Sequence, residues 1–202
     1  MADWTDKINQ VNQEDCLALM AQMPDKSVSL CLTDPPYGIG MAGNPVRQKH
    51  EKQDWDSHPP SKEIFDEILR VSKNQIIWGG NYFSQHLPSS KCFLVWNKLQ
   101  PENFTLAMCE MAWASFDSPA KLFTQSVHKE GNAYHPTQKP VELIKWCMAK
   151  YSQPDDLIFD PFMGSWTTAV AAKQLGRRFI GAELSPAYCE VGRQRLRQEV
   201  LL

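Results

Sequence analysis

The chain has 202 residues, of which 43% are hydrophobic, and this length and composition predict a single domain over residues 1–202 with a stable core. Its formal net charge of −2 excludes a protein that is basic throughout, so a surface for nucleic acid must be a local patch of Lys and Arg. Residues 1–13 are polar, no apolar run is long enough to cross a membrane and the six cysteines form no CxxC pair, so we expect a cytoplasmic protein with reduced cysteines.

Strand-like and helix-like patterns alternate along the chain, with apolar residues at helical spacing in some segments and short apolar runs in others. The predicted elements, in chain order, are a strand over 7–12, a helix over 14–23, a strand over 28–33, a helix capped by Ser61, strands over 75–78, 92–96 and 108–115, a helix over 140–151, a strand over 157–159, a helix over 167–175, a strand over 179–183 and a helix over 186–200. This alternation predicts an α/β fold with a mostly parallel sheet and helices on both faces.

Asp34, Pro35, Pro36 and Tyr37 directly follow the predicted strand over 28–33. The exocyclic amine of a base is a weak nucleophile because its lone pair is delocalised into the ring, and acceptors directed at its protons return that lone pair to nitrogen. The Asp34 carboxylate and a carbonyl of the rigid Pro-Pro segment are such acceptors, and Tyr37 offers a flat face for an extruded base. These residues indicate an enzyme that methylates bases; the alternative is a plain turn that ends a strand.

A second group of residues follows the predicted strand over 157–159. Residues 160–168 combine a tight turn of small residues with the start of a helix. Free N–H groups, hydroxyls and the helix dipole at such a start favour an anion, for example the carboxylate of a methionine-like ligand. Glu183 ends the next strand, where an acidic side chain can accept hydrogen bonds from ribose hydroxyls. An ordinary helix start and a solvated glutamate are the alternatives.

With these motifs the chain resembles the amino-methyltransferases that act on DNA with S-adenosylmethionine, in the permuted group whose catalytic motif precedes the cofactor motif. The resemblance rests on the DPPY motif at 34–37, the FxGxG-type motif at 159–168 and the HPTQKP segment at 135–140, and it covers most of the chain, from Asn12 to Arg197. It implies a Rossmann-like class I methyltransferase fold, a flipped base, and direct methyl transfer without a covalent enzyme intermediate or a metal.

The resemblance also implies which residues form the site. The expected catalytic residues are Asp34, Pro35, Pro36 and Tyr37. Residues 15 and 16 match an acidic, small-residue pair that borders the cofactor adenine in such enzymes. The full set of expected cofactor-binding residues is Asp15, Cys16, Asp34, His135, Gln138, Lys139, Asp160, Phe162, Gly164, Ser165, Trp166, Thr167, Thr168, Glu183 and Leu184.

One residue departs from the family pattern, which usually has a second glycine where this chain has Trp166. Glycine at this position lets the backbone pass close to the cofactor. A tryptophan there crowds the site, stacks on the cofactor or packs away from it against a helix. We expect the chain to retain cofactor binding, because the rest of the motif is intact.

Two segments are candidates for contact with DNA. Residues 38–60 form a long connection, which we interpret as a lid over the base pocket. Residues 98–134 lie where the related enzymes carry their target-recognition segment, and they are too few for a separate recognition domain. Arg193, Arg195 and Arg197 are interpreted as a solvated helix face. The candidate DNA contacts are Arg47, Lys49, His50, Lys52 and Lys98.

The favoured reaction is methyl transfer to the N6 amine of an adenine in double-stranded DNA. The N4 amine of cytosine is the alternative within the same chemistry, but the related cytosine enzymes more often carry Ser at the position of Asp34. RNA or a protein glutamine is a more distant acceptor. A catalytically weakened, methyltransferase-like protein that binds nucleic acid is the alternative from another class, and the intact residues 34–37 argue against it.

His128 and His135 have no cysteine or carboxylate partners at ligand spacing, so no metal site is expected. A homodimer is expected by analogy with related enzymes, because a single domain of this size covers little DNA. The resemblance is to enzymes of bacteria and phages. The sequence leaves open the recognition sequence and the role, whether in restriction-modification, in a phage or in regulation.

Overall fold

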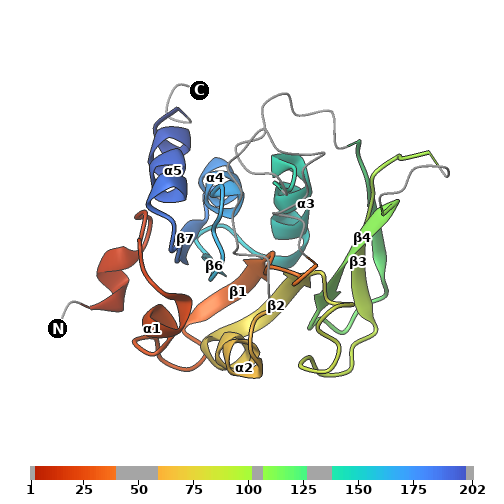
Figure 1. The fold of residues 1–202 in the computed structure, drawn as a ribbon, viewed down its shortest axis with the longest axis horizontal. Helices are drawn as coiled ribbons and strands as arrows, with labels where there is room; N and C mark the ends of the chain where they lie inside the picture. Colours follow the sequence, from red (N-terminus) through yellow and green to blue (C-terminus); the bar gives the residue numbers. More distant parts are fainter. Residues whose placement is uncertain (1–2, 40–58, 102–106, 127–137, 199–202) are drawn as a thin grey trace.

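A single sheet with the strand order β5-β3-β4-β2-β1-β6-β7 runs through the part of the chain that the structure describes (Figure 1). The structure is a computed structural model and describes residues 3–39, 59–101, 107–126 and 138–198. The strands are β1 Val28–Thr33, β2 Ser72–Trp78, β3 Cys92–Asn97, β4 Cys109–Ala114, β5 Lys121–Thr124, β6 Leu157–Asp160 and β7 Arg178–Gly181. The helices are a 3-10 helix at Trp4–Lys7, α1 Cys16–Met20, α2 Lys62–Val71, α3 Val141–Tyr151, α4 Thr167–Gln174 and α5 Pro186–Gln198.

Strand direction determines which chain segments meet at the candidate site. Strand β1 is parallel to β2 and β6, and β6 is parallel to β7. Strand β4 is antiparallel to both of its neighbours, β2 and β3. The carboxyl ends of β1, β2, β3, β6 and β7 therefore lie at one edge of the sheet, together with the beginning of β4. The predicted mostly parallel α/β fold is confirmed.

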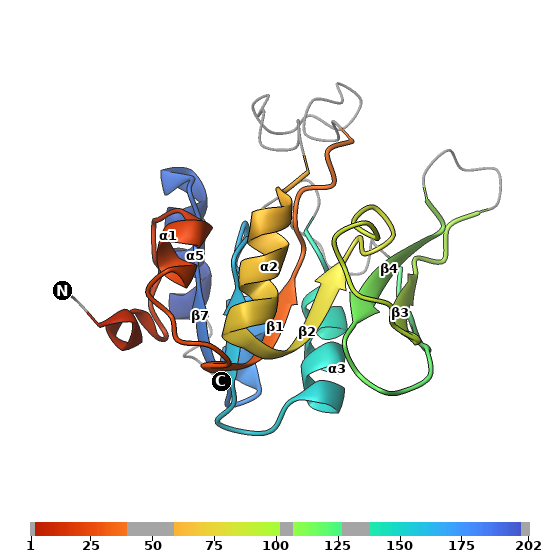
Figure 2. The same cartoon turned by 90° about the horizontal axis from the view of Figure 1, so that it is seen from below.

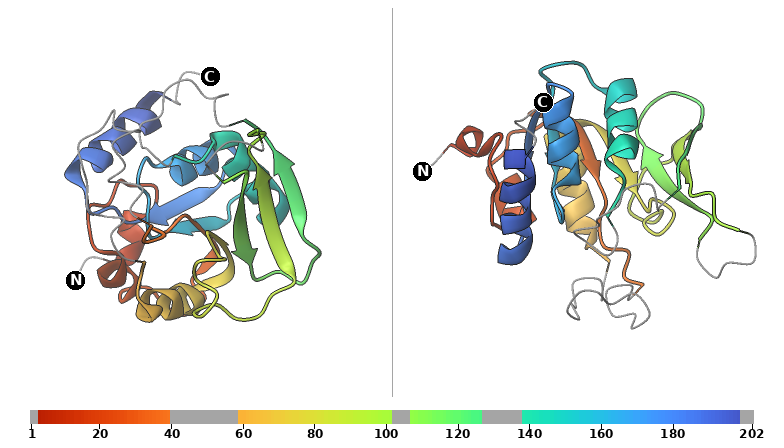
Figure 3. Two further views of the ribbon diagram at one scale, coloured as in Figure 1. Left: turned by 45° about the vertical axis from the view of Figure 1, so that its right-hand side comes forward. Right: turned by 90° about the horizontal axis from the view of Figure 1, so that it is seen from above.

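Helices cover both faces of the sheet. Helices α3, α4 and α5 lie over one face, and α1 and α2 over the other (Figures 1, 2 and 3). Because side chains alternate along a strand, neighbouring residues belong to different cores. Leu32 of β1 packs with α3 and α4, whereas Cys31 packs with α1 and α2. In β2, Ile76 and Ile77 divide in the same way.

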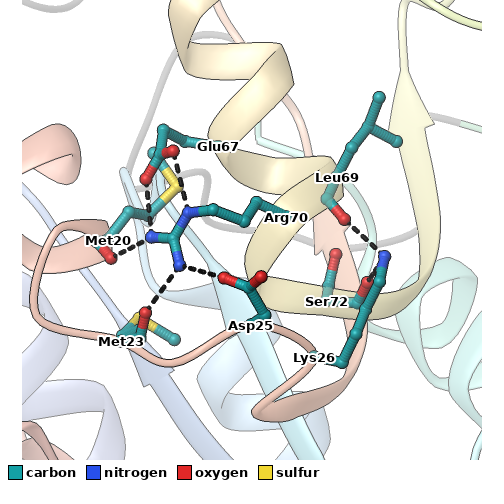
Figure 4. Close-up of polar contacts among 8 residues, drawn as sticks. All are labelled: Met20, Met23, Asp25, Lys26, Glu67, Leu69, Arg70 and Ser72. Carbon is teal, nitrogen blue, oxygen red and sulfur yellow. Dashed lines mark hydrogen bonds and ion pairs between the residues drawn. The ribbon is translucent and has the colours of Figure 1, made fainter.

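A cluster of polar contacts connects the turn before β1 to the end of α2 (Figure 4). It lies at the amino-terminal edge of β1 and β2, opposite the edge where the carboxyl ends of these strands lie. The Lys26 ammonium donates to the carbonyls of Leu69 and Ser72. The Arg70 guanidinium donates to the carboxylates of Glu67 and Asp25 and to the carbonyls of Met20 and Met23. This cluster stabilises the fold away from the candidate site.

One predicted strand is absent, and one observed strand was not predicted. Residues 7–12 do not form a strand, because Asn9 has a left-handed φ of 60° and pairs with Phe179 through its own backbone N–H and side-chain carbonyl. Strand β5 was not predicted, because Lys121 and Thr124 are exposed at the edge of the sheet and leave little apolar pattern. Among the described residues no helix is both long and apolar enough to cross a membrane.

Candidate active site

The two sequence motifs meet at the carboxyl ends of adjacent strands. Asp34 follows the last residue of β1, and Asp160 is the last residue of β6. The Thr33 hydroxyl donates to Asp160 Oδ1 over 2.7 Å and joins the two strand ends. This placement agrees with the rule that open α/β sheets bind ligands beyond the carboxyl ends of their strands.

Asp34 belongs to a network of charged groups that the structure largely buries. Its Oδ1 accepts a hydrogen bond of 2.7 Å from the Tyr37 hydroxyl, and its Oδ2 lies 2.6 Å from the ammonium of Lys139. The same ammonium contacts Glu110 Oε2 at 2.8 Å and the Tyr37 hydroxyl oxygen at 3.2 Å. The three N–H groups of Lys139 thus have three acceptors, which keeps Asp34 in one orientation.

Lys98 extends this network through the other carboxylate oxygen of Glu110. Its ammonium forms an ion pair with Glu110 Oε1, and its side chain is 12% exposed. Burial by itself raises the pKa of Glu110, but the ammonium groups of Lys139 and Lys98 outweigh burial and lower that pKa to about 2. Burial raises the pKa of Asp34 above its ordinary value, and the charge of Lys139 offsets this only in part. Asp34 is therefore a stronger proton acceptor than Glu110.

The Tyr37 ring lies in a pocket of small and aromatic residues. Gly79, with φ of 71°, follows β2, and a Cβ on it would lie 2.2 Å from Tyr37 Cε1, so the ring needs a glycine here. The ring of Tyr82, 46% exposed, stacks on Tyr37 with 4.9 Å between centroids and 19° between planes. Burial, followed by the charge of Asp34, raises the pKa of Tyr37, so its hydroxyl stays protonated as a donor.

The expected cofactor turn lies between β6 and α4. Glu183, just beyond β7, accepts N–H groups from Gly164 at 2.8 Å and from Ser185 at 2.7 Å, one on each carboxylate oxygen. Gly164 has φ of 49°, in the left-handed region that suits glycine. Burial raises the pKa of Glu183 above its ordinary value. The Leu184 N–H also donates to this carboxylate, so it keeps room for one further donor.

Asp160 is buried and holds the beginning of this turn. Its Oδ1 accepts the N–H of Phe162 at 3.0 Å in addition to the Thr33 hydroxyl, and Thr168 donates a further hydrogen bond. Burial raises the pKa of Asp160 to about 6, although these three donors favour the ionised form. Asp160 therefore orients the turn.

Asp15 and Cys16 lie beside Glu183. Gln13 forms an isolated parallel bridge with Glu183, which brings the start of α1 to this end of β7. The exposed Asp15 caps α1 by accepting the N–H groups of Leu17 and Ala18. Burial raises the pKa of the Cys16 thiol to about 11, so Cys16 is not an ionised nucleophile at neutral pH.

The hydroxyls at the start of α4 are not free, contrary to expectation. The hydroxyls of Ser165 and Thr167 lie 3.1 Å apart and bond to each other, while Thr168 bonds to Asp160. The Trp166 side chain is fully buried and faces α5, so only its backbone borders the turn. Leu184 is 67% exposed next to Glu183.

Other expected site residues lie elsewhere or outside the described residues. The interpretation of Arg195 as solvated is wrong, because this side chain is buried and bonds to the backbone of the cofactor turn. Lys98 is tied to Glu110 and does not stand free on the surface. Gln138 is partly buried next to Lys139. The residues that lie outside the described ranges are Arg47, Lys49, His50, Lys52, His128 and His135.

Sequence reasoning missed Glu110, Gly79 and Tyr82. Glu110 lies near the beginning of a strand, whereas site residues in such sheets are sought at strand ends. Gly79 and Tyr82 lie in the segment after β2, where the pair Gly79-Gly80 was a signal for a close backbone approach. Within the described ranges, no cluster of His, Cys, Asp and Glu side chains can hold a metal ion.

Comparison with known proteins identifies the family. The family model described as DNA methylase, of the N6/N4 type, matches residues 77–194. YubD of Escherichia coli (strain K12), which is named as a methylase, is 30% identical over 91% of this chain and 88% of its own length. The chain belongs to the DNA methylase family. The type II methyltransferase M.HinfI of Haemophilus influenzae is 26% identical over 96% of the chain and 69% of its own length.

Solved structures show that this DNA methylase has the class I methyltransferase fold. The M1.HpyAVI–SAM complex matches with a TM-score of 0.62 at 21% identity, covering 93% of this chain and 98% of that one. The cytosine-N4-specific PvuII DNA methyltransferase matches with a TM-score of 0.65 at 17% identity, over 90% of this chain and 84% of that one. At these identities the structures establish the fold and not the target base.

Proposed function

We propose that this DNA methylase transfers the methyl group of S-adenosylmethionine to the N6 amine of an adenine extruded from double-stranded DNA. The observation that carries the proposal is the Asp34 carboxylate, which lies at the end of β1 beside the cofactor motif. Tyr37 and Lys139 each use one of its oxygens, so both oxygens keep a lone pair for the protons of an amine. Adenine is favoured because the related cytosine enzymes more often carry Ser in place of Asp34.

The residues of the turn fit S-adenosylmethionine. Glu183 lies where it can accept a ribose hydroxyl, and its remaining lone pair matches that donor. Glycine at 164 keeps the turn free of a side chain, and the Trp166 indole points into the α4–α5 interface instead of filling the turn. The bound cofactor supplies a methyl group on a sulfonium, which is already an activated donor.

The protein residues orient the base and take up charge. Asp34 and the Pro35 carbonyl accept the amine protons, which returns the lone pair to the nitrogen. As the nitrogen becomes positively charged, the raised pKa of Asp34 favours uptake of the departing proton. Tyr37 stacks on the base, which takes the position of the Tyr82 ring. Most of the acceleration comes from positioning.

The contacts with DNA and the assembly are part of the same proposal. Residues 38–60 act as a lid and residues 98–134 as a short recognition segment within one domain. Arg47, Lys49, His50 and Lys52 bind phosphates, and Lys98 joins them only if its ion pair with Glu110 opens. The active form is a homodimer, which light scattering of the purified protein tests.

The experiment incubates the protein with labelled S-adenosylmethionine and unmethylated DNA and then analyses the nucleosides. N6-methyladenine is the expected product. N4-methylcytosine would instead show that the target base is cytosine. Asp34→Ala is expected to lower transfer at least about 10²-fold while calorimetry still detects cofactor binding. An active Asp34→Ala variant contradicts the mechanism, and a wild-type protein that binds no cofactor contradicts the proposed function.

A further inference from the structure

Helix α5 contacts the candidate cofactor site through one residue on each successive turn. Its buried residues Cys189, Gly192 and Arg195 are spaced by three and lie on one side of the helix. The Cys189 thiol lies 3.6 Å from the carbonyl of Glu183. Helices α4 and α5 lie next to each other over the same face of the sheet (Figures 1 and 3).

Trp166 adopts a backbone conformation that favours glycine. Its φ is 64°, in the left-handed region, and it is the residue before α4 begins. An L side chain in this conformation is strained, so something must hold the residue there. The indole is fully buried, and its N–H has no acceptor among the described residues. The indole is therefore held by packing and not by a hydrogen bond.

The indole packs onto the backbone of α5 at Gly192. A Cβ on Gly192 would lie 2.5 Å from Trp166 Cδ1 and 2.6 Å from Cγ. These atoms are at the root of the indole, so the buried ring can move away from such a Cβ only if it leaves its rotamer or if the Trp166 backbone shifts. A glycine on one helix thus gives room to the large residue of the turn.

Arg195 forms hydrogen bonds with the residues on both sides of Trp166. Its Nη1 donates to the carbonyl of Ser165 over 2.6 Å and to the hydroxyl of Thr167 over 3.0 Å. The guanidinium is buried, and hydrogen bonds from a buried charge are stronger than neutral ones. Helix α5 therefore contacts residues 165–167 both by packing and by hydrogen bonding.

We propose that α5 positions the cofactor turn, with Gly192 accommodating Trp166 and Arg195 fixing residues 165–167, so that cofactor affinity depends on this helix. Gly192 and Arg195 are positioning residues and do not touch the cofactor. The identity of the ligand rests on the proposed function, whereas the coupling between Trp166 and Gly192 does not.

The decisive variant is Gly192→Ala. Alanine within a helix is normally more stable than glycine, so without the contact this change raises the melting temperature. With the contact, the melting temperature falls and the Kd for S-adenosylmethionine rises at least about tenfold, because the displaced indole moves the turn. The double variant Trp166→Gly/Gly192→Ala is expected to restore the Kd to within about threefold of wild type.

Arg195→Met tests the hydrogen bonds from Arg195 to residues 165 and 167. Arg193→Met is the control, because Arg193 lies on the same helix in an exposed pair with Glu190. Arg195→Met is expected to raise KM for S-adenosylmethionine about tenfold while KM for DNA stays unchanged. Arg195→Lys is expected to show a smaller rise in KM for S-adenosylmethionine, because it keeps the charge. A stabilised Gly192→Ala protein, or a double variant that binds no better than Gly192→Ala, overturns the inference. If the wild type binds no cofactor, the proposed function fails, and the melting temperatures alone still test the coupling.

Discussion

The ammonium of Lys139 lies 2.6 Å from the Asp34 carboxylate and 2.8 Å from that of Glu110, so one cation pairs with two half-buried acids. The sequence resemblance implies that Lys139 binds the cofactor, and in the structure its ammonium pairs with Asp34 and Glu110. The ion pair favours the ionised form of Asp34 and opposes the effect of burial, and an ionised carboxylate is the better acceptor for an amine proton.

Lys139→Met is therefore expected to impair catalysis in a pH-dependent way. Without the ammonium, burial and the charge of Glu110 raise the pKa of Asp34 further, so more of it is protonated at neutral pH. Activity at pH 7 should fall about tenfold or more and recover in part as the pH rises. The pH profile of kcat measures this. Lys145→Met, which breaks a surface pair with Glu142, is the control, and an unshifted profile would contradict the role of Lys139.

Gly79→Ala is expected to displace Tyr37. The added Cβ would lie 2.2 Å from the ring, and the residue has φ of 71°. Gly176→Ala is a matched control, because Gly176 has φ of 66° but no atom within 4 Å of an added Cβ. Both variants should lose about 1 kcal/mol of stability through backbone strain, and only Gly79→Ala should also lose activity. Denaturant unfolding measures the loss of stability and the methylation rate measures the loss of activity. Equal losses of activity in the two variants would refute the steric account.

Tyr82→Ala is expected to lower KM for DNA. If the flipped base takes the place of the Tyr82 ring, the base must first break the Tyr37–Tyr82 stack. Such aromatic pairs contribute about 0.5–1.5 kcal/mol, so KM should fall roughly twofold to tenfold with kcat unchanged. Initial rates over a range of DNA concentrations measure it. A rise in KM would mean that Tyr82 forms a second wall of the base pocket.

Asp160→Asn is expected to change how stability varies with pH. The pKa of Asp160 is raised from 3.8 to about 6, so the folded protein holds a proton that the unfolded chain releases between these values. The contribution of Asp160 to the free energy of unfolding is therefore fully present below pH 4 and is lost as the pH rises through 6. This contribution is on the order of 2–3 kcal/mol. Relative to Asp160→Asn, the wild type should lose unfolding free energy from pH 4 to 7. Urea unfolding of both proteins measures this difference, and parallel pH curves would exclude it.

The sequence could predict the site residues that lie at the carboxyl ends of buried strands. Asp34 and Asp160 each come at the end of a buried apolar run, and the carboxyl ends of parallel strands meet at one edge. Strand β1 was predicted with its observed bounds for the same reason, since all but one of its residues are buried. Local patterns of this kind depend on few distant contacts.

Glu110 and Arg195 could not be predicted, because their roles depend on packing between distant segments. Strand β4 is antiparallel, so its beginning, and not its end, lies at the site edge, and no local pattern shows this reversal. Arg195 lies in a run of arginines that is typical of a solvated helix, and its burial follows only from the position of α5 on α4. The side-chain pairing of Asn9 with Phe179, in place of a strand, is also a tertiary effect.

The contact between Lys139 and Asp34 joins residues that are 105 positions apart, and Glu110 comes from between them. During synthesis the Asp34 carboxylate therefore emerges long before its counter-ion. A nascent chain that ends before Lys139 carries the complete DPPY motif but lacks the charge that orients it. Methylation is consequently a property of the finished fold, and amino-terminal fragments that contain the motif should have no activity until a carboxyl-terminal fragment with Lys139 is added in trans.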